Sequence, residues 1–198
     1  EAEESRILLH GILEHVPEGI TIACKPSLSL LRISKSGLAM LGLPAEAIIG
    51  KPLSEIAALQ IIRRPDGEQP VTLDELALAR AIFRREVVTN QEWVFHTPDG
   101  RRLAILADAA PLRDAHGEIT GAVVIWQDIT ARKATEQALR ESEAQFRTVA
   151  ENANVAIGIA RDLRLLYVNP CLARDIGYAE DELIGTDGHP APPAMMIR

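Results

Sequence analysis

The sequence of 198 residues predicts an α+β chain, in which an antiparallel sheet with flanking helices is followed by a long polar helix. Short β-branched runs between turns that contain Gly or Pro predict strands joined by hairpins. The clearest strand is residues 122–126, AVVIW, a composition that favours a buried, pleated position. Residues 131–147 contain no Gly or Pro and predict a helix. The strand and the helix meet at Asp128-Ile129-Thr130, where the Thr130 hydroxyl is expected to cap the free helix amides.

The first part of the chain predicts a helix, a hairpin and two short helical segments. An amphipathic stripe identifies the first helix, and a Lys-Pro-Ser turn joins the two strands of the hairpin. Gly and Pro residues end the two short helical segments. In chain order, these elements are residues 2–15, 19–24, 28–34, 36–43 and 45–50.

The middle of the chain predicts a loop-like stretch at residues 51–73, then a helix and three strands. Thr72 and Glu75 have the spacing of a capping box, which predicts a helix over residues 73–85. Beyond it, two turns that contain Gly separate three β-type runs, so the end of this region is expected to form a meander. The three runs are residues 91–97, 102–112 and 119–129.

Composition limits the classes of protein. The sequence is 47% hydrophobic and 25% charged, as soluble globular proteins are, and its net charge of −7 argues against nucleic acid as a partner. Two cysteines, Cys24 and Cys171, form neither a disulfide framework nor a metal motif, so we expect a cytoplasmic location. No apolar run is long enough to span a membrane, and no membrane contact is expected in this segment. Because the chain begins at Glu1, we expect it to be part of a longer protein, and any membrane anchor would lie in the remaining part.

The sequence also contains an internal repeat. Residues 19–23 match residues 156–160, Gly42 matches Gly177, and Ile49-Gly50 matches Ile184-Gly185. The second copy starts near Phe146 and lacks the three-stranded meander, and the Pro-rich tail 186–198 shows no helix or strand period. The expected domains are an N-terminal helix, a first module, a signalling linker helix and an incomplete second module with a Pro-rich tail, at residues 1–17, 18–130, 131–147 and 148–198.

This order of elements, with Asp-Ile-Thr and a charged helix after the last strand, resembles a PAS domain, and the whole resembles the PAS-plus-linker region of bacterial sensor histidine kinases. In the second copy, Asn169 lies in a segment that resembles the family more closely, whereas the first copy has Ser34 at the matching position. The motifs that carry the resemblance are residues 37–42, 48–51, 98–101, 111–114, 128–133, 136–147, 167–170 and 176–185.

The resemblance implies a PAS fold with a five-stranded antiparallel sheet in the order 2-1-5-4-3 and helices over one face. It also implies that Asp128, Ile129 and Thr130 couple the sheet to the linker helix. For Asp128 we expect an Arg or backbone amides as partner, or else a simple helix-starting role. A homodimer through the N-terminal helix, the linker helix or both is implied, together with an output kinase domain of a two-component system in the parent chain.

A pocket between the sheet and the helices is a second candidate site, although core packing is the simpler role for its aromatic residues. A haem-binding relative needs an axial His on the helix before the meander, and residues 73–85 contain none. The cysteine-containing segment of flavin-binding relatives is absent as well, so we predict no cofactor and leave an unidentified small ligand open. The side chains expected to line this pocket are Leu76, Phe83, Trp93, Phe95 and Trp126.

No catalytic motif is present, and no metal ligands are grouped, so this chain is expected to have no catalytic activity of its own. Three roles stay open on the residues alone. The chain is a signal-relay and dimerisation segment of a sensor kinase, a ligand-binding module of a diguanylate cyclase or transcription regulator, or a structural dimer spacer. Leu139, Phe146 and Val149 have seam-like spacing on the linker helix, which fits the first and third roles.

Overall fold

The computed structural model describes residues 2–26, 28–59, 61–66 and 68–185. The chain forms two compact units, residues 1–134 and residues 135–198. Within the described ranges, no helix is both long and apolar enough to cross a bilayer. The predicted Pro-rich tail, residues 186–198, lies outside the described residues.

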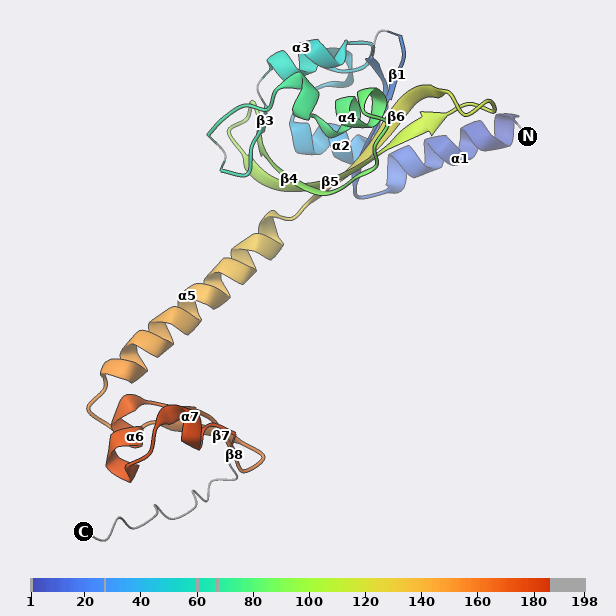
Figure 1. Cartoon of the computed structure of the whole chain (residues 1–198). Helices are drawn as coiled ribbons and strands as arrows, with labels where there is room; N and C mark the ends of the chain where they lie inside the picture. The colour runs from blue at the N-terminus through green and yellow to red at the C-terminus, as the bar shows by residue number, and fades with distance from the viewer. Residues whose placement is uncertain (1, 27, 60, 67, 186–198) are drawn as a thin grey trace, which may run out of the picture. The chain divides into compact units, whose positions relative to one another are not determined.

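The first unit is built on one curved antiparallel sheet (Figure 1). Its strand order is β2-β1-β6-β5-β4-β3. The five longer strands therefore have the order that the PAS resemblance implies. The central pair is β1 and β6, which joins the hairpin at the start of the chain to the last strand of the meander. The strands are β1 (Gly19–Cys24), β2 (Ser29–Ile33), β3 (Ile62–Arg63), β4 (Val88–His96), β5 (Arg102–Arg113) and β6 (Ile119–Asp128).

The sheet has six strands, so the expected number of five was wrong by one short edge strand. Strand β3 pairs with β4 through Ile62↔Phe95 and Arg63↔Val94. It lies in the stretch that was predicted as loop. Two residues are too few to show the alternation that identifies a strand in a sequence.

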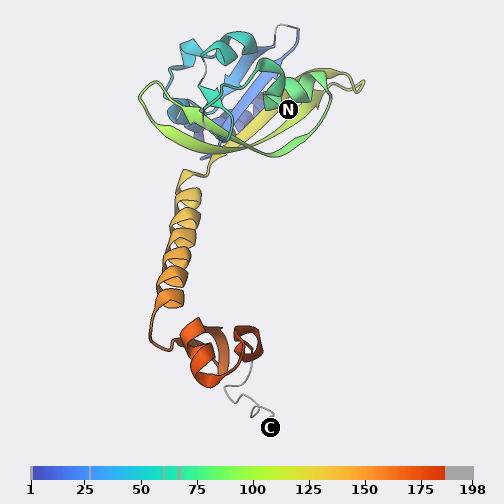
Figure 2. The same cartoon turned by 60° about the vertical axis from the view of Figure 1, so that its left-hand side comes forward.

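Helices α2, α3 and α4 lie together on one side of this sheet (Figures 1 and 2), and the main hydrophobic core fills the space between them and the sheet. The predicted helix over residues 73–85 is divided, because Leu76 has extended backbone angles, φ −59° and ψ 133°. The helical segments of this unit are α1 (Ala2–His15), α2 (Lys35–Leu41), η1 (Ala45–Ala47), α3 (Leu53–Ala58), η2 (Leu73–Glu75) and α4 (Ala77–Phe83).

Two glycines allow β1 and β6 to approach closely. A Cβ at Gly121 would lie 2.2 Å from the carbonyl oxygen of Ala23 on β1, which real Cβ atoms do not do. A Cβ at Gly19 would lie 2.4 Å from the ring of Trp126. The absence of these two side chains therefore fixes how β6 pairs with β1 and where the Trp126 ring packs.

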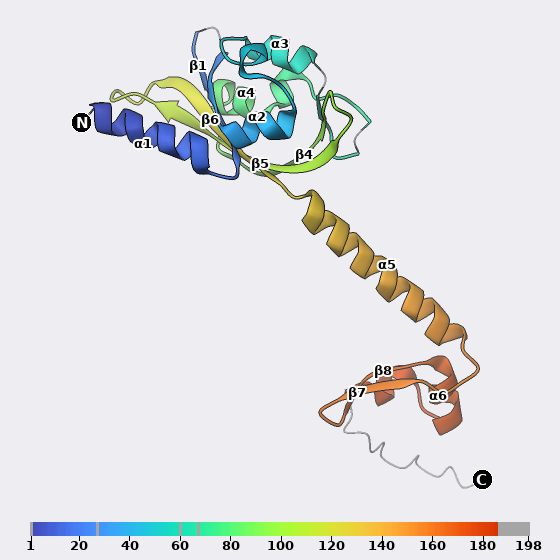
Figure 3. The same ribbon diagram turned by 180° about the vertical axis from the view of Figure 1, so that it is seen from behind.

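Helix α5 (Thr130–Asn152) begins in the first unit and continues into the second, which also contains a hairpin and two short helices (Figure 3). Its small core contains Val168, Ala173 and Leu183. All four residues of β7 are exposed, and in the described part of the chain β7 pairs with β8 alone. The elements are β7 (Gly158–Arg161), β8 (Arg164–Val168), α6 (Pro170–Ile176) and α7 (Glu180–Leu183).

The hydrogen bonds of the two units repeat as the sequence does. The Ser34 hydroxyl accepts the amides of Ile20 and Gly37, and the Asn169 side-chain oxygen accepts those of Ile157 and Leu172. Both capping residues are fully buried. Asn169 has two further donors, which reach the carbonyl oxygens of Ala150 and Val155, whereas Ser34 has one, which reaches that of Glu18. The amide group therefore ties its own copy together at more points than the hydroxyl does.

The glycines of the repeat have matching roles too. Gly42 and Gly177 both adopt the left-handed conformation that ends a helix. The amides of Gly50 and Gly185 both donate to a strand carbonyl, that of Leu30 or Leu165, at 2.8 Å. The repeated residues are thus the ones that fix the backbone at the ends of the short helices.

Candidate functional site

The joint between β6 and α5 is built from the Asp-Ile-Thr motif and one residue of β5. The amide of Ile129 donates to the carbonyl of Ala104, and the amide of Ala104 donates to the Thr130 hydroxyl, both at 2.8 Å. Strand β6 itself ends one step earlier, where Asp128 lies opposite Ile105. The Thr130 side chain thus accepts a hydrogen bond from β5 at the point where the main chain has left the sheet and begun the helix.

The two polar residues of the motif have different roles at the joint. Thr130 was expected to cap the helix, and this was wrong, because its hydroxyl accepts from the neighbouring strand instead. Asp128 supplies the capping interaction: its carboxylate accepts the amide of Thr130 at 2.8 Å. Of the partners expected for Asp128, the structure therefore shows a backbone amide at the start of the helix.

An ion pair joins the first turn of α5 to the sheet as well. The ammonium of Lys133 lies 2.5 Å from the carboxylate of Glu92 on β4. Both side chains are partly exposed, so the pair contributes at most about 1 kcal/mol to stability. Sequence reasoning missed it because the partners are far apart in the chain. The helix start is thus held by β5 through hydrogen bonds and by β4 through charge.

The second feature is an apolar cavity of about 80 Å³ between the sheet and the helices. Leu76, Trp93, Phe95 and Trp126, which the sequence places at this pocket, line it. The rings of Phe95 and Trp126 meet edge to face, with centroids 5.0 Å apart. The lining also includes Thr21, whose hydroxyl oxygen lies 3.4 Å from the indole nitrogen of Trp126 and accepts its N–H. No pattern in the sequence identifies Thr21 as a pocket residue, because Thr side chains are mostly exposed in folded proteins.

Phe83 was predicted to line this cavity and does not. It is the last residue of α4, and its side chain is 60% exposed. The inward positions of that helix are occupied by Leu78, Ile82 and small alanines, which let the helix lie close to the sheet.

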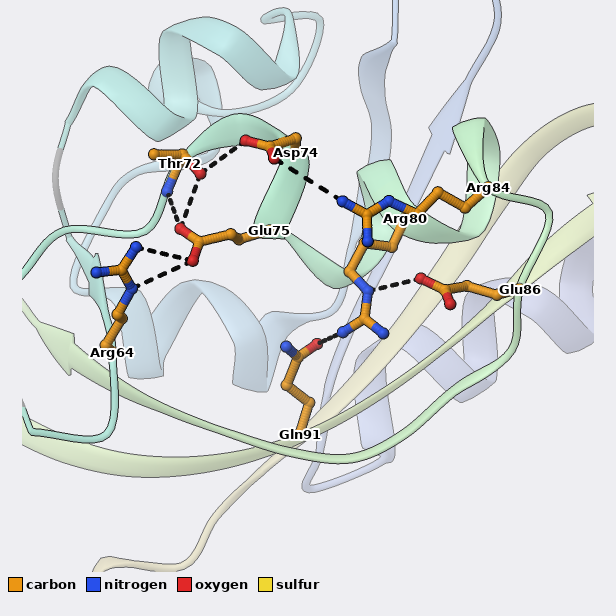
Figure 4. Close-up of polar contacts among 8 residues, drawn as sticks. All are labelled: Arg64, Thr72, Asp74, Glu75, Arg80, Arg84, Glu86 and Gln91. Carbon is orange, nitrogen blue, oxygen red and sulfur yellow. Dashed lines mark hydrogen bonds and ion pairs between the residues drawn. The ribbon is translucent and has the colours of Figure 1, made fainter.

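Polar contacts hold the η2–α4 segment, whose residues Leu76, Ala77 and Leu78 line the cavity (Figure 4). The Glu75 carboxylate accepts the amide of Thr72 at 2.9 Å and pairs with the Arg64 guanidinium at 2.9 Å. Hydrogen bonds from the Thr72 backbone and hydroxyl, and then from Arg64, lower the pKa of Glu75 from 4.5 to about 2. This carboxylate is therefore charged at every pH at which the protein would work.

A second arginine in Figure 4 connects α4 to the sheet. Arg80 on α4 donates to Glu86 at 2.6 Å and to Gln91 on β4 at 3.0 Å. Its hydrogen bond holds the pKa of Glu86 below the usual range. Arg64 thus contacts η2 through Glu75, and Arg80 connects α4 to Gln91 on the sheet. Polar contacts therefore hold both parts of the η2–α4 segment in place.

Neither feature has the arrangement of a catalytic or metal centre. Among the described residues, no group of three or more His, Cys, Asp or Glu side chains is placed to hold a metal ion. The two free cysteines, Cys24 and Cys171, are both half-buried and lie in different units. Strand β5 contributes both to the cavity, through Ala107, and to the helix joint, through Ala104.

Several known proteins are similar to this chain in sequence or in fold. A curated relative, the two-component sensor PprA of Pseudomonas aeruginosa, is 34% identical over 79 residues, which cover 39% of this chain and 9% of that sensor. The structure of an RNA-binding light-oxygen-voltage receptor is similar in fold, with a TM-score of 0.54, 19% identity, and coverage of 72% of this chain and 38% of that one. The PAS domain of BvgS from Bordetella pertussis matches with a TM-score of 0.46, 23% identity, and coverage of 71% and 97%.

The family itself is shown by a sequence model. The model of the PAS domain matches residues 17–131, which is more than half of the 198 residues. The matched segment begins before β1 and ends in the first turn of α5, so it includes both the cavity and the helix joint. This chain therefore belongs to the PAS domain family.

Proposed function

We propose that this chain is the signal-relay region of a two-component sensor kinase, in which the state of the PAS core reaches helix α5 through the Asp128–Thr130 joint. The observation that carries the proposal is the double hydrogen bond of Ala104 to Ile129 and Thr130. Ala104 lies on the strand that also supplies Ala107 to the cavity wall. A shift of β5 that follows from a change in the core would therefore move both attachment points of the helix.

The two-component setting is supported by the partial match to a two-component sensor. The parent's catalytic output is part of the proposal, because the matched segment covers 9% of that sensor. No observation of comparable weight favours a diguanylate cyclase or a transcription regulator. A cytoplasmic location fits two half-buried cysteines that form no disulfide.

The core cavity is proposed to act without a large prosthetic group. Its volume of about 80 Å³ is well below the ~300 Å³ at which ordinary ligand pockets begin. An apolar cavity of this kind accepts a few heavy atoms at most, as small dry cavities that bind xenon do. We therefore expect the purified protein to be colourless.

Dimerisation through helices α1 and α5 completes the proposal. Ile7 and Leu8 on α1 are 62% and 66% exposed, and Leu139 and Phe146, which are seven residues apart on α5, are 59% and 46% exposed. Exposed large apolar side chains at helical spacing are what a parallel helix pair buries. A pairing of this kind would carry a rotation or shift of α5 onward as a change of helix packing.

The relay is tested in the full-length protein by measuring histidine autophosphorylation with Asp128→Ala. Loss of the capping hydrogen bond is expected to change the autophosphorylation rate while the fold is kept, because the Asp128 side chain is exposed. Asp114→Ala is the matched control, since its carboxylate likewise accepts backbone amides, those of His116 and Glu118, in the β5–β6 turn. Equal rates for the wild type and Asp128→Ala would overturn the proposed relay.

A further inference from the structure

Two guanidinium groups and one imidazole meet on the face of the sheet that points away from the core. Residues Trp93 and Phe95 of β4 point into the core, so His96 points to the opposite face. Arg102 on β5 lies directly opposite His96 in the register. Arg63 on β3 lies opposite Val94, two residues from His96 and on the same face. Adjacent strands thus place Arg63, His96 and Arg102 as near neighbours.

The charge of this cluster is not neutralised within the described part of the chain. Arg63 donates to the carbonyl of Glu68 at 2.7 Å and Arg102 donates to that of Asp66 at 3.3 Å, and neither forms an ion pair among the described residues. Two nitrogen atoms of the cluster, Nε of Arg63 and Nε2 of His96, are buried without a hydrogen-bond partner. Burial lowers the pKa of His96, and the two guanidinium groups lower it further.

Three other arginines of the same unit form ion pairs, unlike Arg63 and Arg102. Arg64, Arg80 and Arg101 each hold a carboxylate, with nitrogen–oxygen distances of 2.9, 2.6 and 2.8 Å. Arg63 and Arg102 are among the arginines of this unit that form no ion pair within the described part of the chain, and these two lie together on one face of the sheet. An uncompensated pair of guanidinium groups is the kind of surface that recognises an oxyanion.

A groove of about 350 Å³ opens beside this cluster on the same face. Arg102 and Pro65 border one end, and Lys133 on α5 borders the other. The side chains between them include Val94 and Ile129, both of which are largely buried and apolar. Since Lys133 is already paired with Glu92, the positive charge of the groove lies at its Arg102 end. The volume falls within the range of small-molecule sites, ~300–1,000 Å³.

We propose that this groove binds a small organic carboxylate, with the carboxylate on the Arg102 guanidinium and an apolar body over Val94 and Ile129. The guanidinium fork matches a carboxylate in two parallel hydrogen bonds, and the apolar floor selects an anion that carries hydrocarbon over an inorganic one. Thr130 also lines the groove, so a bound molecule would contact the sheet and the start of α5 together. Binding of the carboxylate does not depend on the proposed signalling role, because it is measured directly on this chain without any output activity.

The test is a titration of the ¹⁵N-labelled full chain with benzoate, followed by NMR. Benzoate is expected to give saturable shifts at the amides of Val94, Ala104 and Ile129. Arg102→Gln is expected to weaken binding roughly ten-fold or more, the usual effect of losing a charged hydrogen bond. Arg113→Gln is the matched control, because Arg113 is another exposed arginine of β5 that donates to a backbone carbonyl, that of Gly117. Its affinity for benzoate should equal that of the wild type.

Two control ligands and a pH titration of His96 complete the experiment. Benzyl alcohol has the same ring without the charge, and inorganic phosphate has charge without the ring, so both should bind at least ten-fold more weakly than benzoate. Saturation with benzoate should raise the pKa of His96, because a nearby anion stabilises the imidazolium form. Equal binding of benzyl alcohol or phosphate, or unchanged affinity in Arg102→Gln, would overturn the proposal.

Discussion

Replacing Thr130 by Val removes one hydrogen-bond acceptor at the joint and leaves the shape of the side chain nearly unchanged. The amide of Ala104 then loses its partner, while the amide of Ile129 keeps the carbonyl of Ala104. A buried donor left without a partner costs about 1–3 kcal/mol. Ala104 is half-buried, so water can reach part of the site, and we expect a loss of about 1–2 kcal/mol in the free energy of unfolding. Val and Thr have similar helix propensities, so the helix itself contributes little to the change.

The loss is measured by urea denaturation and located by amide hydrogen exchange. The Ala104 amide should exchange faster in Thr130→Val, and the free energy of unfolding should fall by the stated amount. Thr120→Val is the control, because Thr120 also lies on β6 but donates a long, exposed bond of 3.3 Å to Leu112. That variant should stay within about 0.5 kcal/mol of the wild type. Unchanged exchange at Ala104, or equal losses in the two variants, would refute the role assigned to the Thr130 hydroxyl.

Two further predictions concern acid stability and association. The pKa of Glu75 is lowered to about 2, so its charge stabilises the folded state above pH 4.5, and this contribution is lost as the pH falls toward 2. Allowing for the partial exposure of Glu75, urea denaturation of Glu75→Gln should show that the free energy of unfolding is roughly 1–2 kcal/mol lower than in the wild type at neutral pH. This difference should shrink toward pH 2, and a difference that does not depend on pH would contradict the prediction. Light scattering should show that this chain forms a dimer and that Leu139→Ala weakens it. Leu163→Ala is the control, because Leu163 is an 82% exposed residue of the hairpin, and this variant should leave the dimer intact. A monomeric wild type would contradict the prediction.

The fold could be predicted where local residues specify local geometry. Gly42 and Gly177 end their helices in the left-handed conformation, as their place after short helical runs predicts. The repeat of Ser34 and Asn169 likewise corresponds to two equivalent capped turns. Strand β3 could not be predicted, because its two residues are a strand only by virtue of their pairing with β4.

The candidate site was harder to predict, because its contacts join distant parts of the chain. The hydroxyl of Thr130 has a possible partner in the helix next to it, so local pattern predicts a cap, whereas its real partner is Ala104. Lys133 and Glu92 carry no mark in the sequence that relates one to the other. The aromatic residues of the cavity were predictable from strand alternation, but the exposure of Phe83 depends on where α4 ends.

The central claim is that a change in the core cavity reaches α5 through Thr130, and xenon tests it most directly. Xenon enters small apolar cavities without any change of sequence. In the wild type, NMR under xenon pressure should show amide shifts that extend from Ala107 through Ala104 to Lys133 in the first turn of α5. In Thr130→Val, the shifts should remain at Ala107 and no longer reach Lys133. The same response at Lys133 in both proteins would contradict the account.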